Sequence, residues 1–278
     1  MTGKPASHAW YLGPMRLAVA SSLAGSVACV AACAIGCSET RPAAITEAEA
    51  GTHVPASPVP DGDGGTGYCA THAAGSAFCD DFDHGALGTG WDFVQPTPPG
   101  RATLDTITFL SPPAALVVAT EVVADAELAS IFFRKTEKGS PSRAVLGFDV
   151  FADDIQATGT LAVATLDLAV DHLLTLYLRD DDPIAAGPTL TEVAPGANVA
   201  VRNPLAKVPA AGAWSRIELD VDTRRAVAVV RLNGATILTA PIAKAAAKDP
   251  TVRVGALVSG PAAAYTLRFD DVTLDVTP

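Results

Sequence analysis

The stretch AWSRIELDVDTRRAVAVVRLNGATILTAPI, Ala213–Ile242, decides the fold. Apolar and acidic residues alternate along its first third: Ile217, Glu218, Leu219, Asp220, Val221 and Asp222. This period of two predicts a strand with one buried side and one side in water. Residues 222–225 predict a turn into a second strand, Ala226–Leu232. Asn233-Gly234 then favours a two-residue hairpin leading into Ala235–Leu238, so the stretch predicts three consecutive antiparallel strands.

Similar short β-type runs, separated by Gly, Pro, Asp and Asn, continue through most of the chain after Tyr68. The further predicted strands are Ile131–Arg134, Val145–Phe151, Leu161–Leu168, Leu173–Arg179, Val199–Arg202, Val252–Val258 and Tyr265–Val276. Only Ile242–Asp249 favours a helix, and it is short. Many strands at regular spacing predict an all-β chain folded as an antiparallel β-sandwich or jelly roll.

Three stretches resemble the concanavalin A-like lectin/glucanase superfamily, including its laminin G-like domains. They are FCDDFDHGALGTGWDF from Phe78, GAWSRIELDVDTRRAVAVVRLNG from Gly212, and the closing YTLRFDDVTLDV from Tyr265. The resemblance covers about Phe78–Pro278 and implies a concanavalin A-like sandwich whose first and last strands lie side by side. It says little about function, because the same architecture hosts lectins, hydrolases, lyases and adhesion modules.

The N-terminus predicts export. Lys4 and Arg16 precede Leu17–Gly36, an uncharged run rich in Ala, Val, Ser and Gly, after which polar residues return. The end of the run, AIGC, resembles a bacterial lipoprotein signal peptide, residues 1–36, cleaved before a lipid-bearing Cys37. Cys33 is an alternative lipidation site, and an uncleaved membrane helix is an alternative to cleavage. The resemblance implies an exported, membrane-anchored protein of the cell envelope, an outer-membrane lipoprotein.

Residues 37–67 predict a tether, because they are dense in Pro, Gly, Ala and acids and hold almost no large apolar residues. The predicted domain is therefore 68–278. With Cys37 lipidated, Cys69 and Cys79 remain as a natural disulfide pair across a short, small-residue loop in an oxidising compartment. Two buried free thiols are the alternative.

The chain is acidic, with a formal net charge of -11. Removal of the predicted signal peptide takes two positive charges, Lys4 and Arg16, and leaves -13. Such a surface repels phosphate backbones, so the net charge argues against nucleic acid as a partner.

The closing strand predicts a β-bulge, because its apolar residues change parity at Asp270-Asp271. A bulge there would turn these carboxylates toward the first strand, which carries Asp81 and Asp83. The four form a candidate metal site for a structural Ca²⁺, the only cofactor that the sequence suggests. Separate solvated carboxylates are the alternative.

No complete catalytic motif is present, so no catalytic residue is assigned. Glu218, Asp220 and Asp222 approach the acidic strand motif of glucanases of this superfamily, but the last residue is Asp where Glu is expected. Trp91 and Trp214 fall where the resemblance makes them core residues, so no stacking platform for sugars is visible. The favoured function is a non-catalytic binding module of the cell envelope, possible ligands being a polysaccharide or an envelope protein. A glycoside hydrolase or polysaccharide lyase of the same fold, and a protein-binding adhesion or scaffold domain, stay open.

Overall fold

The computed structural model describes residues 67–72, 75–124, 128–155, 159–169, 171–181, 186–197, 199–244 and 247–278. All of them belong to one compact unit, Ser57–Pro278. The predicted signal peptide, Cys37 and the tether up to residue 66 lie outside the described residues, so those assignments and the domain boundary at Tyr68 stay predictions. Within the described residues, no helix has the length and apolar character needed to cross a membrane.

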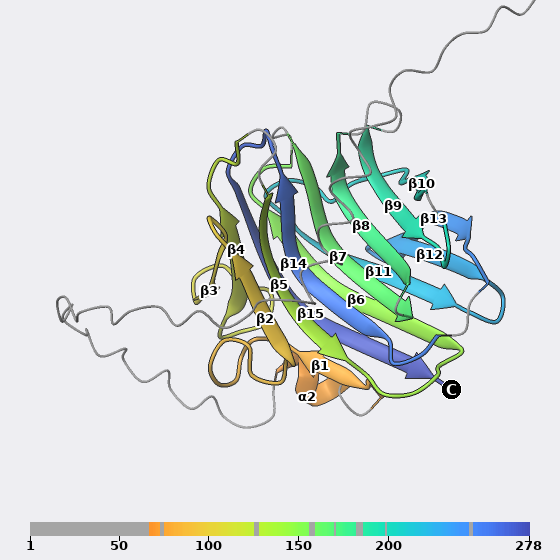
Figure 1. Ribbon diagram of the computed structural model, residues 1–278. Coiled ribbons are helices and arrows are strands. Elements are labelled where there is room, and N and C mark those ends of the chain that lie inside the picture. The colour runs from red at the N-terminus through yellow and green to blue at the C-terminus, as the bar shows by residue number, and fades with distance from the viewer. Residues whose placement is uncertain are drawn as a thin grey trace, which may run out of the picture. The chain divides into compact units, whose positions relative to one another are not determined.

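Two antiparallel sheets form the unit (Figure 1). Sheet A has the order β13 (Ala235–Pro241), β12 (Val227–Leu232), β11 (Trp214–Asp222), β6 (Arg143–Ala152), β15 (Tyr265–Thr277), β4 (Ala115–Thr120) and β3 (Arg101–Asp105), and β1 (Phe78–Asp80) also pairs with β15. Sheet B has the order β10 (Val201–Pro204), β9 (Gly187–Val193), β8 (His172–Asp180), β7 (Thr160–Ala169), β14 (Thr251–Ser259), β5 (Leu128–Thr136) and β2 (Phe93–Thr97). A short helix, α2 (Tyr68–His72), precedes β1. The predicted antiparallel β-sandwich is confirmed.

The core lies between the two sheets and is built from alternate residues of their strands. Its largest fully buried side chains include Phe133, Phe148, Phe269, Ile131, Leu146, Leu174 and Leu176. Each such side chain stabilises the fold by about 1.5–3 kcal/mol relative to an exposed one. Trp91 is buried against Phe78 and Phe133, as the resemblance implied, whereas Trp214 is only half-buried and packs on Phe151.

The hairpin predicted from the opening stretch is confirmed. Strands β11, β12 and β13 follow one another in the sheet, and the Asp222 carboxylate accepts a hydrogen bond from the Arg225 N–H in the first turn. Asn233 and Gly234 have φ angles of 50° and 75°. Both values lie in the left-handed region that a two-residue hairpin needs and that Asn and Gly tolerate best.

Two local predictions were wrong. In the described parts of 242–249 there is no helix; the chain follows Pro241 in irregular form, and the Lys248 N–H bonds to the Leu168 carbonyl in β7 instead of closing a helical turn. The strand expected at Val199–Arg202 begins two residues later, at Val201. Tertiary contacts override weak local propensity at both places.

Candidate functional site

Strand β15 pairs with three neighbouring strands, and the predicted bulge lies where two of them meet. β6 lies along one edge of β15, while β4 and β1 lie end to end along the other. β4 pairs with Tyr265–Phe269 and β1 with Val272–Leu274, so Asp270 and Asp271 face the gap between them. The register against β6 shifts there, and Asp271 has a φ of 50°. The bulge and the neighbouring first and last strands are confirmed.

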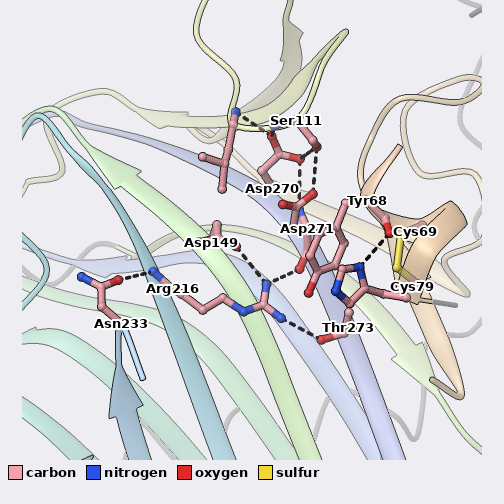
Figure 2. A network of polar contacts seen from close by, with 12 residues as sticks. Tyr68, Cys69, Cys79, Ser111, Asp149, Arg216, Asn233, Asp270, Asp271 and Thr273 are labelled. Carbon is pink, nitrogen blue, oxygen red and sulfur yellow. Dashed lines mark hydrogen bonds and ion pairs between the residues drawn. A yellow bond between two sulfur atoms is a disulfide. The ribbon is translucent and has the colours of Figure 1, made fainter. Parts of the chain in front are cut away.

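The bulge carboxylates bind the chain that enters β4. Asp270 Oδ2 accepts hydrogen bonds from the N–H groups of Leu110 and Ser111 at 2.9 and 3.0 Å. The Ser111 hydroxyl lies 3.0 Å from Asp270 Oδ1 and 2.8 Å from Asp271 Oδ1 (Figure 2). Burial raises the pKa of Asp270 to about 7 and that of Asp271 to about 6. These buried carboxylates thus serve as acceptors for backbone and hydroxyl donors at a break in the sheet edge.

The carboxylates that follow β1 play a similar part. The Cys69 N–H donates to Asp81 Oδ2 at 2.9 Å, and the Ala114 N–H donates to Asp83 Oδ1 at 3.2 Å. Asp83 Oδ2 is buried without a hydrogen-bond partner, and burial raises the pKa of Asp83 to about 7. In the residues that the structure describes, no group of three or more His, Cys, Asp or Glu side chains is arranged to hold a metal ion. Calcium binding at these four carboxylates stays a prediction.

A disulfide joins Cys69 in α2 to Cys79 in β1, as predicted. Beside it, the Arg216 guanidinium bonds to Asp149 Oδ2 at 2.9 Å, to Thr273 Oγ1 at 3.0 Å and to the Asp271 carbonyl (Figure 2). The guanidinium also lies 5.5 Å from the centre of the Tyr68 ring. Arg216 therefore ties β11, β6, β15 and α2 together, which is a structural role.

The acidic residues of β11 do not form a glucanase-type site. The Asp220 carboxylate is paired with Arg143 at 2.7 Å and Arg231 at 3.1 Å, and the hydrogen bond from Arg143 lowers its pKa. Such a carboxylate stays ionised and cannot act as a general acid. Glu218 instead lines a cavity of about 410 Å³ between α2 and sheet A. His172 is buried, and its Nε2 lies 2.7 Å from Glu192 Oε1.

The outer face of sheet B carries a continuous line of paired residues, which we call the cross-sheet row. From one edge of the sheet to the other it consists of Phe93, Arg134, Arg253, Thr165, Thr175, Thr191 and Arg202, each the direct cross-strand partner of the next. These residues alternate along their strands with core residues such as Phe133, Val254 and Leu176. The row therefore points away from the core.

Two arginines face each other in the cross-sheet row. Like charges directly opposite on neighbouring strands destabilise a sheet unless other groups offset them. Arg253 Nη1 bonds to Asp167, 2.7 Å from Oδ2, and to Thr165 Oγ1 at 3.2 Å. Burial raises the pKa of Asp167 even though the Arg253 charge opposes this. A single carboxylate thus sits beside two guanidinium groups.

Arg134 is the less satisfied of the two. Within the described residues it makes no ion pair, and its Nε is buried without a hydrogen-bond partner. Its guanidinium lies 5.1 Å from the centre of the Phe93 ring, an aromatic side chain that is 46% exposed. A buried donor with no acceptor costs about 1–3 kcal/mol.

Sequence reasoning missed this face. In SIFFRKT, Phe132 and Arg134 alternate with the core residues Ile131 and Phe133, and in TVRV Arg253 stands between two core valines. The alternation could have placed each arginine on an outer face. That they lie opposite each other follows only from the pairing of β5 with β14, which are more than a hundred residues apart in sequence.

No known family matches the sequence, and no curated protein is similar enough in sequence to count as a match. Solved structures of similar fold exist. The endo-β-1,4-glucuronan lyase of the fungus Trichoderma reesei is 15% identical, with a TM-score of 0.56 over 73% of this chain and 96% of that one. The cellulose induced protein Cip1 is also 15% identical, with a TM-score of 0.53 over 72% of this chain and 97% of that one. The likeness shows the fold, a jelly-roll β-sandwich.

Proposed function

We propose that this protein is a polysaccharide-binding module and that its ligand lies along the cross-sheet row on the outer face of sheet B. The observation that carries the proposal is the unbroken row itself, which crosses all seven strands of the sheet. Neighbouring strands lie about 4.8 Å apart, so six spacings give a line about 29 Å long. An extended polymer of several sugar units fits such a line better than a small molecule does.

The chemistry of the row suits sugars. Thr165, Thr175 and Thr191, each only 6–7% exposed, place hydroxyl groups at the floor of the row, and such groups can both donate and accept hydrogen bonds. Phe93, at one end, exposes an aromatic ring on which a sugar ring can stack, and Phe132 lies on the same side of β5 as Arg134. Polar groups along the floor and rings at one end are the elements of a carbohydrate surface.

The structures of similar fold support a polysaccharide ligand in general terms. One of them is named as a lyase of a polysaccharide, and the name of the other links it to cellulose. At 15% identity no residue role is transferred from either. The ligand face is therefore argued from the residues of this chain alone.

A second candidate function, a polysaccharide lyase of the same face, is favoured by Tyr177. Two residues along β8 from Thr175, it lies on the same side of the strand, and burial raises its pKa. A lyase removes the proton next to a uronate carboxyl group, breaks the bond to the leaving glycosidic oxygen and returns a proton to that oxygen. A tyrosine with a raised pKa stays protonated at neutral pH and is suited to the last step, but a poor base for the first.

The experiment that tests both functions is retention of the full-length chain on immobilised polysaccharides, with released products measured by the ultraviolet absorbance of unsaturated chain ends. Thr175→Trp fills the middle of the row, while Val229→Trp adds the same ring to the outer face of sheet A as a matched control. We expect retention without product, lost only in Thr175→Trp. Release of unsaturated products would establish the lyase instead. No retention on any polysaccharide would overturn both.

We further propose that the module works at the bacterial cell envelope, tethered by residues 37–67 to a lipid on Cys37. The support is the lipoprotein-like AIGC sequence ahead of a polar, proline-rich segment. Partitioning of the expressed chain into a detergent phase tests this. Cys37→Ala should abolish partitioning and Cys33→Ala should not; partitioning unchanged by Cys37→Ala would refute the assignment.

A further inference from the structure

We infer that the polysaccharide is anionic and that its carboxylate or sulfate groups are bound by Arg134, with Arg253 as the second cation. This inference rests on the proposed binding face and names the class of ligand for it. It starts from the most unusual local feature of that face, two arginines placed directly opposite each other in a chain with a net charge of -11.

The two arginines differ in what they already bind. Arg253 is held by Asp167 and Thr165, so its charge is largely offset. Arg134 lies over the Phe93 ring and has a buried Nε with no acceptor among the described residues. Asp167 is paired directly with Arg253 and acts on Arg134 only through its charge, so the positive charge of Arg134 is the less offset of the two.

A guanidinium group selects a particular partner. Its N–H donors form a planar fork that matches the paired oxygens of an acid group, and such charge-assisted bonds are stronger than bonds to neutral hydroxyls. A neutral sugar would leave the charge of Arg134 offset only by the shared Asp167, whereas an acid group would pair with that charge directly. The adjacent ring of Phe93 would stack on the sugar that carries the acid.

The acidity of the whole chain does not exclude such a ligand. Net repulsion acts at long range, and salt screens it beyond about 8 Å at physiological ionic strength. Contacts to Arg134 are direct and only weakly screened. Binding should therefore depend on one local cation rather than on overall charge, which makes the inference testable by single substitutions.

The test compares oligosaccharides that share a β-1,4 backbone and length but differ in charge: a neutral glucan, a glucuronan with a carboxylate on each sugar, and a sulfated glucan. Affinities for the full-length chain are measured by calorimetry. We expect an acidic oligosaccharide to bind at least about tenfold more tightly than the neutral one, the gain expected from one charge-assisted hydrogen bond. The two acidic arms show which acid group is preferred.

Substitutions then locate the contact. Arg134→Gln breaks no ion pair of the described residues, so the fold should be unaffected, and it should remove the preference for the acidic oligosaccharide. Arg253→Lys keeps a cation beside Asp167 and should weaken binding less. Arg101→Gln removes the same charge from an exposed arginine of β3, in a pair with Glu121 at 3.5 Å, and should change nothing.

Each outcome of these binding measurements either supports the inference or counts against it or the proposed function. Acid preference lost in Arg134→Gln and kept in Arg101→Gln supports the inference. Equal binding of neutral and acidic oligosaccharides, lost in Thr175→Trp, would overturn the inference and leave the proposed function standing. Acid preference that survives Arg134→Gln would also overturn it. Binding of none of the three would count against the proposed function itself.

Discussion

Removing the disulfide measures how firmly α2 is held by its other contacts. The perturbation is the double variant Cys69→Ala, Cys79→Ala. The two residues are 10 apart in sequence, and a cross-link that closes a loop of about that length restricts the unfolded chain by about 2.7 kcal/mol at 25 °C. No residue of α2 is buried, so the core between the sheets should stay intact in the variant.

The full loss of about 2.7 kcal/mol in the free energy of unfolding is expected only if α2 stays in place without the disulfide. Its other contacts among the described residues include the hydrogen bond from the Cys69 N–H to Asp81 and the packing of Tyr68 on Arg216. The backbone donor at residue 69 and the Tyr68 ring are both kept in the variant. If α2 were released in the folded state, the folded chain would regain the same freedom as the unfolded one, and the loss would approach zero.

Urea denaturation followed by tryptophan fluorescence gives the free energy of unfolding and its slope with urea. We expect a loss of about 2.7 kcal/mol with an unchanged slope, because the surface exposed on unfolding is the same. A reducing agent should produce the same loss in the parent chain and none in the variant. A loss near zero would refute the claim that Tyr68 and Cys69 hold α2 by themselves.

Three further predictions concern stability. Ser111→Ala removes the hydroxyl beside Asp270 and should lower the free energy of unfolding by about 2 kcal/mol in urea denaturation, because a buried carboxylate loses a donor; an unchanged value would contradict this. Gly147→Ala places a methyl group against the Arg216 guanidinium and should cost about 2 kcal/mol in the same assay; no loss would show that the guanidinium moves aside without cost. The pKa of Asp83, about 7 when folded against 3.8 as its reference value, means that its contribution to stability is complete below pH 3.8 and is lost as pH rises through 7. As the pH falls from 8 to 5, the melting temperature should therefore rise more steeply in the parent chain than in Asp83→Asn. Equal slopes of melting temperature against pH would show that Asp83 does not titrate in this range.

Much of the fold could be predicted because short stretches of sequence determine many of its strands and turns. The alternation in β11, the Asn233-Gly234 turn and the change of parity at Asp270 each depend on a few neighbouring residues. β4 was missed because ALVVAT is a short continuous apolar run without alternation, and β2 because Pro96 interrupts it. β9, in GPTLTEV, mixes Gly, Pro and Thr and gives little signal of its own.

The candidate site could not be predicted, because it depends on which strands pair. The sequence predicted a site at carboxylates that lie close together along the chain. In the structure the bulge carboxylate Asp270 instead accepts hydrogen bonds from backbone N–H groups. Arg134 and Arg253 meet only because β5 and β14 are neighbours in sheet B. The missing acceptor of Arg134 likewise depends on the packing around it, which no short stretch of sequence determines.

The most direct test of the central claim is to map the ligand on the molecule. Backbone amide hydrogen exchange of the full-length chain, with and without a β-1,4-glucuronan oligosaccharide, reports which strands the ligand protects. We expect added protection in β5, β14 and β7 of sheet B, around Arg134, Arg253 and Thr165. Protection confined to β11, β6 and α2, around the cavity over sheet A, would contradict the account.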